Sequence, residues 1–492
     1  MLRVNEKELL TRFGFENPWW SNPDTLDRLL DGKRDRAYLP LFLDLVRKTE
    51  VRRAVVLMGP RRVGKTILLR QTIRALIQDD CVDPKAIFFA SLENPIYRGW
   101  SLDRILQIFM RDRGLDRFAE FWAVFDEIQY LEEWEAHLKV MVDDYPNLRI
   151  IVSGSAAAAL RMKSLESGAG RFTDFLLPPL LFAEYLDFIG ETEAAEGDID
   201  ILNRHFFDYI NFGGFPEAVL NPAIQGDMAR YVAEDIVEKA LLRDLPSLYG
   251  IDNPNELYRF FASMAYNSGQ EVSLGELSKE TGIPKNTVLK YFQFLEAAFL
   301  VHRLYRIDEH GQRPRREMGF KVYLTNPCLR AAMFSPVHDG DDPKVVGAMV
   351  ETAVMAQVVQ SSMIHDCYYA RWRDGEIDLV LVNGTSGKPL RAEEFKWSDR
   401  VARDRSVVGN LISFAKRHSL RAAVISSKTH SETFEIDGIP VLCRPVARLC
   451  ADHSDTARFI LDVIGIHPRG NDPAHQDRAK VRERTMRRPA NG

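Results

Sequence analysis

One short segment near the N-terminus constrains the fold of this 492-residue chain more than any other feature. It follows the pattern G-x-x-x-x-G-K-[ST] and consists of Gly59, Pro60, Arg61, Arg62, Val63, Gly64, Lys65 and Thr66, with Ile67 next. An apolar run precedes it at 55–58, and a helical pattern follows it to Ile77. Glycines in a strand-to-helix turn let backbone N–H groups point at one anion, and the helix N-terminus favours negative charge. The segment therefore predicts a phosphate-binding loop in an α/β domain.

A second apolar run, at 121–125, ends in the carboxylates Asp126 and Glu127. In a nucleotide site of this kind Lys65 reaches the β- and γ-phosphates, and Thr66 and Asp126 hold Mg²⁺. Glu127 then polarises the attacking water. An isolated Asp-Glu pair can also open a loop or cap a helix. The apolar run before it favours the site, so ATP and Mg²⁺ are the expected ligands, bound at the carboxyl ends of parallel strands.

Four further side chains are candidates for sensing the γ-phosphate. Ser153 and Ser155 follow a strand candidate at 148–152, although a plain turn would look the same. Arg171 could act as a sensor in its own subunit or as an arginine finger in a homo-oligomer, and Arg243 is a weaker competitor. Most arginines only solvate a surface, so this role is an expectation that the geometry must decide.

Composition excludes several classes of protein. The chain is 46% apolar and 27% charged, which is typical of a globular protein. It contains no apolar stretch of the roughly 20 residues that a membrane span needs, and its first residues lack the apolar core of a signal peptide. Its five cysteines are scattered. We therefore expect a cytoplasmic protein with free thiols and no membrane partner.

The order of patterns predicts five sections. They are a P-loop α/β domain with a parallel sheet (1–185), a helical lid or connector (186–260), a winged helix-turn-helix (261–330), a second α/β domain (331–465) and a disordered basic tail (466–492). In the third section Ser273 caps one helix, Gly282 marks a turn and Pro284 opens a second helix. The exposed side of that helix carries Lys285 and Lys290, which predicts contact with DNA. Winged helices that only join domains or bind proteins are the alternative.

The fourth section contains the elements of a second active site. Asp378 starts one strand, and Glu394 and Lys396 lie on the next strand of a hairpin, with Glu351 on an upstream helix. Two carboxylates around a divalent ion, with an amine beside the scissile phosphate, are the machinery of metal-dependent phosphodiester cleavage. A surface salt bridge is the simpler interpretation of an E-x-K pattern.

Several motifs together resemble a known family. They are the segment 59–66, Phe-Asp-Glu-Ile-Gln at 125–129, Ser-Gly-Ser at 153–155, Gly170-Arg171, Pro-Pro-Leu-Leu-Phe-Ala-Glu-Tyr at 178–185 and Gly-Gly-Phe-Pro-Glu-Ala at 213–218. From about residue 17 to about residue 450 the chain resembles prokaryotic AAA-type ATPases that carry a C-terminal domain of unknown function. The resemblance implies an AAA-like module, a helical lid, a winged helix and a C-terminal domain similar to restriction endonucleases. Asn326 departs from the Asp usual in that pattern.

The sequence therefore predicts a Mg²⁺-dependent ATPase whose turnover moves the winged helix and the nuclease-like domain, with DNA as a candidate partner. Two alternatives stay open. One is an ATP-gated switch that acts on protein partners. The other is a metal-dependent DNA nuclease that is active only when ATP is bound.

Overall fold

The N-terminal part of the chain is built on a parallel sheet of five strands. The computed structural model describes residues 5–48, 50–154, 170–246, 251–312, 319–359 and 367–451. The strands are β1 (Ala54–Met58), β2 (Ile87–Ser91), β3 (Phe121–Asp126), β4 (Leu148–Gly154) and β5 (Phe172–Leu176), in the order β2-β3-β4-β1-β5. All neighbours pair in parallel. The expected α/β class with a parallel sheet is confirmed.

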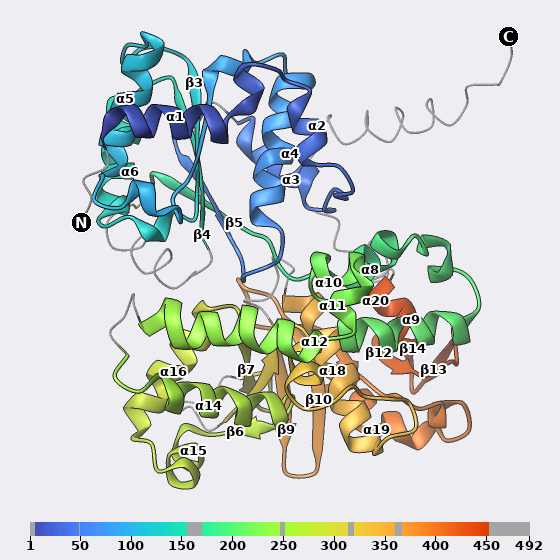
Figure 1. The fold of residues 1–492 in the computed structure, drawn as a ribbon. Coiled ribbons are helices and arrows are strands. Elements are labelled where there is room, and N and C mark those ends of the chain that lie inside the picture. The colour runs from blue at the N-terminus through green and yellow to red at the C-terminus, as the bar shows by residue number, and fades with distance from the viewer. Residues whose placement is uncertain are drawn as a thin grey trace, which may run out of the picture. The chain divides into compact units, whose positions relative to one another are not determined.

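Helices cover both faces of this sheet, as its apolar strands require. Every residue of β1 and β3 is buried, and a parallel sheet with such strands is stable only when both faces are covered. One face packs against α1 (Glu6–Glu16), α5 (Leu102–Arg113) and α6 (Trp134–Asp144). The other packs against α2 (Thr25–Leu29), α3 (Leu39–Val46) and α4 (Lys65–Gln78) (Figure 1). Because β4 lies between β1 and β3, the residues that follow these three strands meet at one edge.

A run of helices follows β5. It comprises α8 (Phe182–Ile189), α9 (Ile199–Phe212), α10 (Pro216–Leu220), α11 (Pro222–Gln225), α12 (Met228–Arg230) and the π-helical segment η6 (Tyr231–Asp244). Next come α14 (Pro254–Tyr266), β6 (Glu271–Val272), α15 (Leu274–Thr281), α16 (Lys285–Ala297), β7 (Val301–Ile307) and β8 (Phe320–Leu324). The Ser273 side chain caps α15, and Gly282 ends it with a φ of 73°. The basic segment 313–318 and the tail beyond residue 451 lie outside the described residues.

Strands β6, β7 and β8 belong to a second sheet, which has nine strands among the described residues. The other six strands of this sheet come later in the chain. They are β9 (Cys367–Trp372), β10 (Gly375–Val382), β11 (Pro389–Glu394), β12 (Ala423–Ser427), β13 (Glu432–Ile436) and β14 (Ile439–Pro445), and the sheet order is β13-β14-β12-β11-β10-β9-β7-β8-β6. The helices of this part are α17 (Cys328–Met333), α18 (Pro343–Val359), α19 (Gly409–Arg417) and α20 (Val446–Ala451).

The continuous sheet corrects one expected domain boundary. A division at residue 330 would separate β7 and β8 from the strands that follow, but β7 pairs in parallel with β9, with Tyr305 opposite Tyr368. An unpaired edge of β7 would expose backbone N–H and C=O groups, and β9 satisfies them. Sections 261–330 and 331–465 therefore share one sheet.

Among the residues that the structure describes, none of the helices combines the length and the apolar character that crossing a bilayer requires.

Candidate nucleotide site

The turn between β1 and α4 has the backbone that a phosphate-binding loop needs. Gly64, just before α4, has φ 95° and ψ 22°, a left-handed conformation that favours glycine. At Gly59 a Cβ atom would lie 2.2 Å from the carbonyl oxygen of Leu177, so a side chain cannot fit there. Arg62 also has a positive φ, of 65°. The two glycines of the motif thus allow a tight turn directly at the N-terminus of α4.

The Lys65 amine lies inside this loop. Its side chain is buried, and its Nζ donates hydrogen bonds to the carbonyl oxygens of Gly59 at 3.0 Å and Pro60 at 2.9 Å. Burial lowers the pKa of the Lys65 amine, while the Glu127 and Asp126 carboxylates act in the opposite direction. The amine is therefore held at the centre of the turn, where phosphate oxygens are stronger acceptors than carbonyls.

Three side chains, from α4, β3 and β4, meet at the carboxyl edge of the sheet. The Thr66 hydroxyl donates to Asp126 Oδ2 at 2.7 Å, and the Ser153 hydroxyl donates to Asp126 Oδ1. The backbone N–H of Glu127 donates to Ser153 Oγ at 3.1 Å. Burial, and then the neighbouring Glu127 carboxylate, raise the pKa of Asp126 to about 6. The structure thus brings together Thr66, Asp126 and Ser153, which are distant in sequence.

Glu127 has an unusual backbone. Its φ of 56° and ψ of 52° lie in the left-handed region, which a non-glycine residue adopts at a cost and which is enriched at functional sites. This conformation turns the chain out of β3, and the Gln129 amide donates to the Glu127 carboxylate. The side chain is half-buried, in contrast to buried Asp126. The two adjacent carboxylates therefore lie in different environments and can serve different roles.

A hydroxyl and a carboxylate at this edge fit Mg²⁺. The ion prefers oxygen ligands and usually keeps waters and substrate phosphates in its shell, so one or two protein oxygens are enough. Thr66 and Asp126 supply them. Within the described ranges no group of three or more His, Cys, Asp or Glu side chains is arranged to hold a metal alone.

The structure corrects the expected role of Arg171 within its own subunit. Arg171 precedes β5, and its carbonyl oxygen accepts from the N–H of Ala54 at the start of β1. The phosphate-binding loop follows the other end of β1. Five strand residues separate these ends, roughly 16 Å at the usual rise per residue. The Arg171 side chain instead pairs with Asp143 at 2.8 Å. Ser155, the other candidate sensor, lies outside the described residues.

Comparison with known proteins agrees with this geometry. Residues 51–186 match the family model of the AAA domain, AAA_14. This segment is an AAA-type P-loop domain. Residues 203–338 match a domain of unknown function, DUF8612, which spans the expected lid and winged-helix sections.

Relatives and solved structures show how far the similarity extends. An uncharacterised protein of Haemophilus influenzae is 24% identical over 393 residues, 79% of this chain and 92% of that protein. An uncharacterised protein of Mycobacterium tuberculosis is 27% identical over 347 residues, 69% of each chain. The Aeropyrum pernix ORC2 protein, solved as ADPNP–ADP complexes, is 14% identical with a TM-score of 0.35, covering 65% of this chain and 93% of its own. The replication initiator DnaA, bound to AMPPCP and single-stranded DNA, is 13% identical with a TM-score of 0.27, covering 52% and 86%. TM-scores this low settle nothing about this chain.

Sequence reasoning missed the partners of the two arginines in the loop of the AAA domain. Arg61 pairs with Asp244 at 2.7 Å. Arg62 pairs with Glu217 at 3.0 Å and with Asp235 at 3.1 Å. These acids lie on α10 and η6, about 150 to 180 residues further along the chain. A depression of about 310 Å³ lies beside the same contact and is lined by Pro60, Arg61, Ile236, Ala240, Asp244, Leu245, Ala298 and Leu300. The loop is thus in direct contact with the helices that follow the AAA domain.

A buried ion pair, Arg36 with Glu184, contacts the backbone of the phosphate-binding loop. Arg36 Nε donates to Glu184 Oε1 at 2.9 Å and Arg36 Nη2 to Glu184 Oε2 at 3.0 Å, a bidentate pair. The same guanidinium donates to the carbonyl oxygens of Val63 at 2.7 Å and Pro178 at 2.9 Å. Both side chains are 5% exposed or less. Arg36 therefore fixes the loop carbonyl of Val63 to the segment that follows β5.

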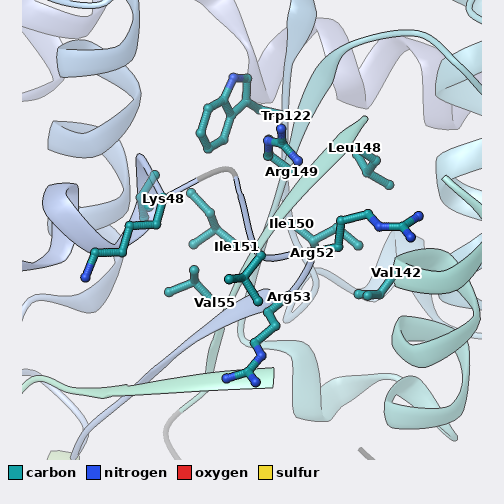
Figure 2. A pocket seen from close by; sticks show the side chains of 12 residues that line it. Lys48, Arg52, Arg53, Val55, Trp122, Val142, Leu148, Arg149, Ile150 and Ile151 are labelled. Carbon is teal, nitrogen blue, oxygen red and sulfur yellow. The ribbon is translucent and has the colours of Figure 1, made fainter. Parts of the chain in front are cut away.

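A second depression, of about 410 Å³, lies at the opposite edge of the sheet (Figure 2). Its lining includes Lys48, Arg52, Arg53 and Arg149, around Val55, Trp122 and Ile151 near the amino ends of their strands. Figure 2 shows the charged ends of Lys48, Arg52 and Arg53 pointing in different directions. They do not converge on one point.

The four candidate nuclease residues also lie together: Glu351 is on α18, Asp378 is on β10, Glu394 ends β11, and Lys396 lies two residues beyond that strand, not on it as expected. Lys396 Nζ lies 3.5 Å from Asp378 Oδ2 and 3.4 Å from Glu394 Oε2. Asp378 and Glu351 are both contacted by Lys321 of β8, a residue that sequence reasoning did not single out. Burial raises the pKa of Glu394 to about 7, although Lys396 opposes the shift. A β-bulge near Asp378 interrupts the pairing of β10 with β9.

Proposed function

We propose that this protein hydrolyses ATP to ADP and phosphate with Mg²⁺. The observation that carries the proposal is the 2.7 Å contact between Thr66, at the N-terminus of α4, and Asp126, at the end of β3. A hydroxyl next to the loop lysine and a carboxylate at the end of another strand of the same sheet are the two protein ligands that Mg-ATP needs. The match of residues 51–186 to the AAA domain supports the same reaction class.

Each residue then has a distinct task. Loop N–H groups and the Lys65 amine bind and orient the phosphates, and Thr66 and Asp126 would hold Mg²⁺. When bound, the ion neutralises charge on the phosphate oxygens. Glu127 orients the attacking water and takes its proton, and Ser153 positions Asp126 and Glu127 through its two hydrogen bonds. Most of the rate enhancement comes from positioning and electrostatics, as in other phosphoryl transfers.

Burial of the Asp126 carboxylate lowers the stability of the fold at neutral pH, so the free energy of unfolding should depend on pH. Its folded-state pKa of about 6 exceeds the ordinary 3.8, so the folded protein binds this proton more tightly than the unfolded chain. The charged carboxylate therefore destabilises the fold above pH 6, and this cost vanishes as the pH falls below about 4. We expect Asp126→Asn to raise the free energy of unfolding at pH 7.5 by about 1–3 kcal/mol and to abolish turnover.

Urea unfolding of the nucleotide-free protein, followed by tryptophan fluorescence, measures this difference at pH 7.5 and pH 5. The gain should be smaller at pH 5. Exposed Asp31, changed to Asn, is the matched control and should give no gain at either pH. An equal gain from Asp126→Asn at both pH values would contradict the titration account.

The loop arginines provide a route from the nucleotide to the rest of the chain. Arg61 and Arg62 pair with acids on η6 and α10, yet they also lie in the loop that binds phosphates. Incoming phosphates compete with Asp244 for the Arg61 guanidinium. ATP binding is thus coupled to release of η6, the helix that leads into α14 and the second sheet. This coupling is the means by which turnover moves the winged helix and the nuclease-like section.

We expect Asp244→Asn to tighten ATP binding by about 3- to 10-fold, because Arg61 no longer has a competing carboxylate. Titration with a fluorescent ATP analogue measures the affinity. Asp227→Asn is the control, since Asp227 pairs only with exposed Arg230 among the ion pairs of the described residues. Weaker ATP binding in Asp244→Asn would show that Asp244 supports the loop instead of competing with phosphate.

DNA is the partner that we propose for the winged helix formed by α15, α16, β7 and β8. The side chains of Lys285, Asn286 and Lys290 are exposed on α16, where a groove-reading helix presents its contacts. Phosphate release from Mg-ATP, measured with and without duplex DNA over a range of salt, tests the whole proposal. Turnover that DNA raises, and that salt reduces steeply, supports a DNA-coupled ATPase. Basal turnover that DNA leaves unchanged favours the ATP-gated switch, and no turnover at all rejects both.

A further inference from the structure

The carboxylate cluster of the second sheet contains a lysine at its centre. Lys321 Nζ lies 2.6 Å from Glu376 Oε1, 3.0 Å from Glu351 Oε1 and 3.7 Å from Asp378 Oδ1. The Lys321 side chain is only 6% exposed. A single ammonium group is therefore shared by carboxylates of α18 and β10.

Lys321 reaches this position because β8 belongs to the same sheet as β10. It lies two residues before Tyr323 on β8, so both side chains point to one face, and the Tyr323 hydroxyl donates to Glu351 at 2.5 Å. The aromatic ring of Tyr369 on β9 lies 5.5 Å from the amine. Two neighbours thus hold the lysine and one of its carboxylates in place, as expected for a structural counter-ion.

The oxygen atoms that a metal would need are already in use. Lys321 faces Asp378 Oδ1, while Oδ2 accepts from the N–H of Phe395 at 2.8 Å and faces Lys396. Lys396 also faces Glu394. A divalent ion among these carboxylates would stand beside two ammonium groups. In agreement, the described part of the chain holds no set of three or more His, Cys, Asp or Glu side chains arranged for a metal.

The positive charges around the cluster nearly balance its negative charges. Glu376 also faces Arg371 at 3.7 Å, Arg371 pairs with Glu271 of β6 at 2.6 Å, and Glu271 faces Arg306 at 3.6 Å. Together with Glu351, Asp378 and Glu394 there are five carboxylates, and they meet four cations: Lys321, Lys396, Arg306 and Arg371. A site built for a divalent ion would instead show an excess of negative charge.

We infer that Lys321 takes the place of a divalent cation in this cluster. Glu351, Asp378, Glu394 and Lys396 form with it a metal-independent ion-pair network that fastens β8 to α18 and β10. The section with the nuclease-like motif therefore cleaves no phosphodiester by a metal mechanism.

Mn²⁺ binding to the full-length protein, measured by electron paramagnetic resonance without nucleotide, tests this inference. The wild type and Asp378→Asn should bind Mn²⁺ equally weakly, because no ion uses Asp378 while Lys321 is present. Lys321→Gln removes the ammonium but keeps a polar side chain of similar length. It should gain a Mn²⁺ site at least about tenfold tighter than any in the wild type, and Lys321→Gln/Asp378→Asn should lose it again.

Lys321→Arg is the charge-preserving control and should bind no more Mn²⁺ than the wild type. Circular dichroism checks that each variant is folded. Wild-type Mn²⁺ binding that disappears in Asp378→Asn would overturn the inference, and this comparison holds even if Lys321→Gln fails to fold. A folded Lys321→Gln that gains no site would overturn it as well, since the lysine would then not occupy the place of a cation.

Discussion

Replacing Glu127 with glutamine is expected to lower ATP turnover by about 100- to 10,000-fold while ATP binding is retained. The side chain keeps its size and its hydrogen bond to Gln129 but can no longer take a proton from water. Asp126, the proposed Mg²⁺ ligand, and Lys65, the proposed phosphate-binding amine, are untouched by the change. Phosphate release gives the turnover, and titration with a fluorescent ATP analogue gives the affinity.

Two comparisons make this result specific. Lys65→Ala should lose ATP binding together with turnover, because it removes the amine at the centre of the loop. Glu132→Gln, an exposed position in the same stretch of chain, should leave both quantities unchanged. Turnover in Glu127→Gln within a few-fold of the wild type would assign the water-activating role to another group. Loss of ATP binding in Glu127→Gln would assign Glu127 to binding.

The parts of the fold that sequence could predict are those set by local pattern. The G-x-x-x-x-G-K-[ST] segment follows an apolar strand and leads into a helix. Strand, segment and helix are consecutive in sequence, so the pattern alone predicts the turn. The meeting of Asp126 with Thr66 follows from one further rule, that the carboxyl ends of parallel strands share an edge. Ser153 joins them because β4 lies between β1 and β3.

The parts that sequence could not predict depend on contacts between distant segments. Nothing near Arg36 in sequence points to Glu184, and nothing near Arg61 points to Asp244. Sequence makes Arg171 a candidate for sensing the γ-phosphate, but the direction of β5 places it at the other edge of the sheet from the phosphate-binding loop. Lys321 went unnoticed because only the pairing of β7 with β9 brings β8 into the second sheet. In each case the deciding information is which strand or helix is the neighbour.

The Arg36–Glu184 pair is expected to be one of the most costly contacts in the molecule to break. Arg36→Met should lower the free energy of unfolding of the AAA domain by about 3–5 kcal/mol, because it leaves a buried carboxylate without its charged partner. It also removes the donor to Val63 O, so ATP binding should weaken along with stability. Urea unfolding of the nucleotide-free protein measures the first effect, and titration with the ATP analogue measures the second.

Arg34 provides a matched control for this change. It lies two residues away and also faces a carboxylate of α8, Asp187, at 3.9 Å, but its side chain is 46% exposed. Arg34→Met should therefore cost no more than about 1 kcal/mol. Arg36→Met/Glu184→Gln should recover part of the lost stability, because it removes the unpaired buried charge and keeps an acceptor for the N–H groups of Ala37 and Leu181, yet the loop would still lack its donor to Val63. A double variant with restored stability and weakened ATP binding would separate the two roles of Arg36. If Arg36→Met costs no more stability than Arg34→Met, the buried pair does not support the fold, and unchanged ATP binding in Arg36→Met would show that it does not support the loop.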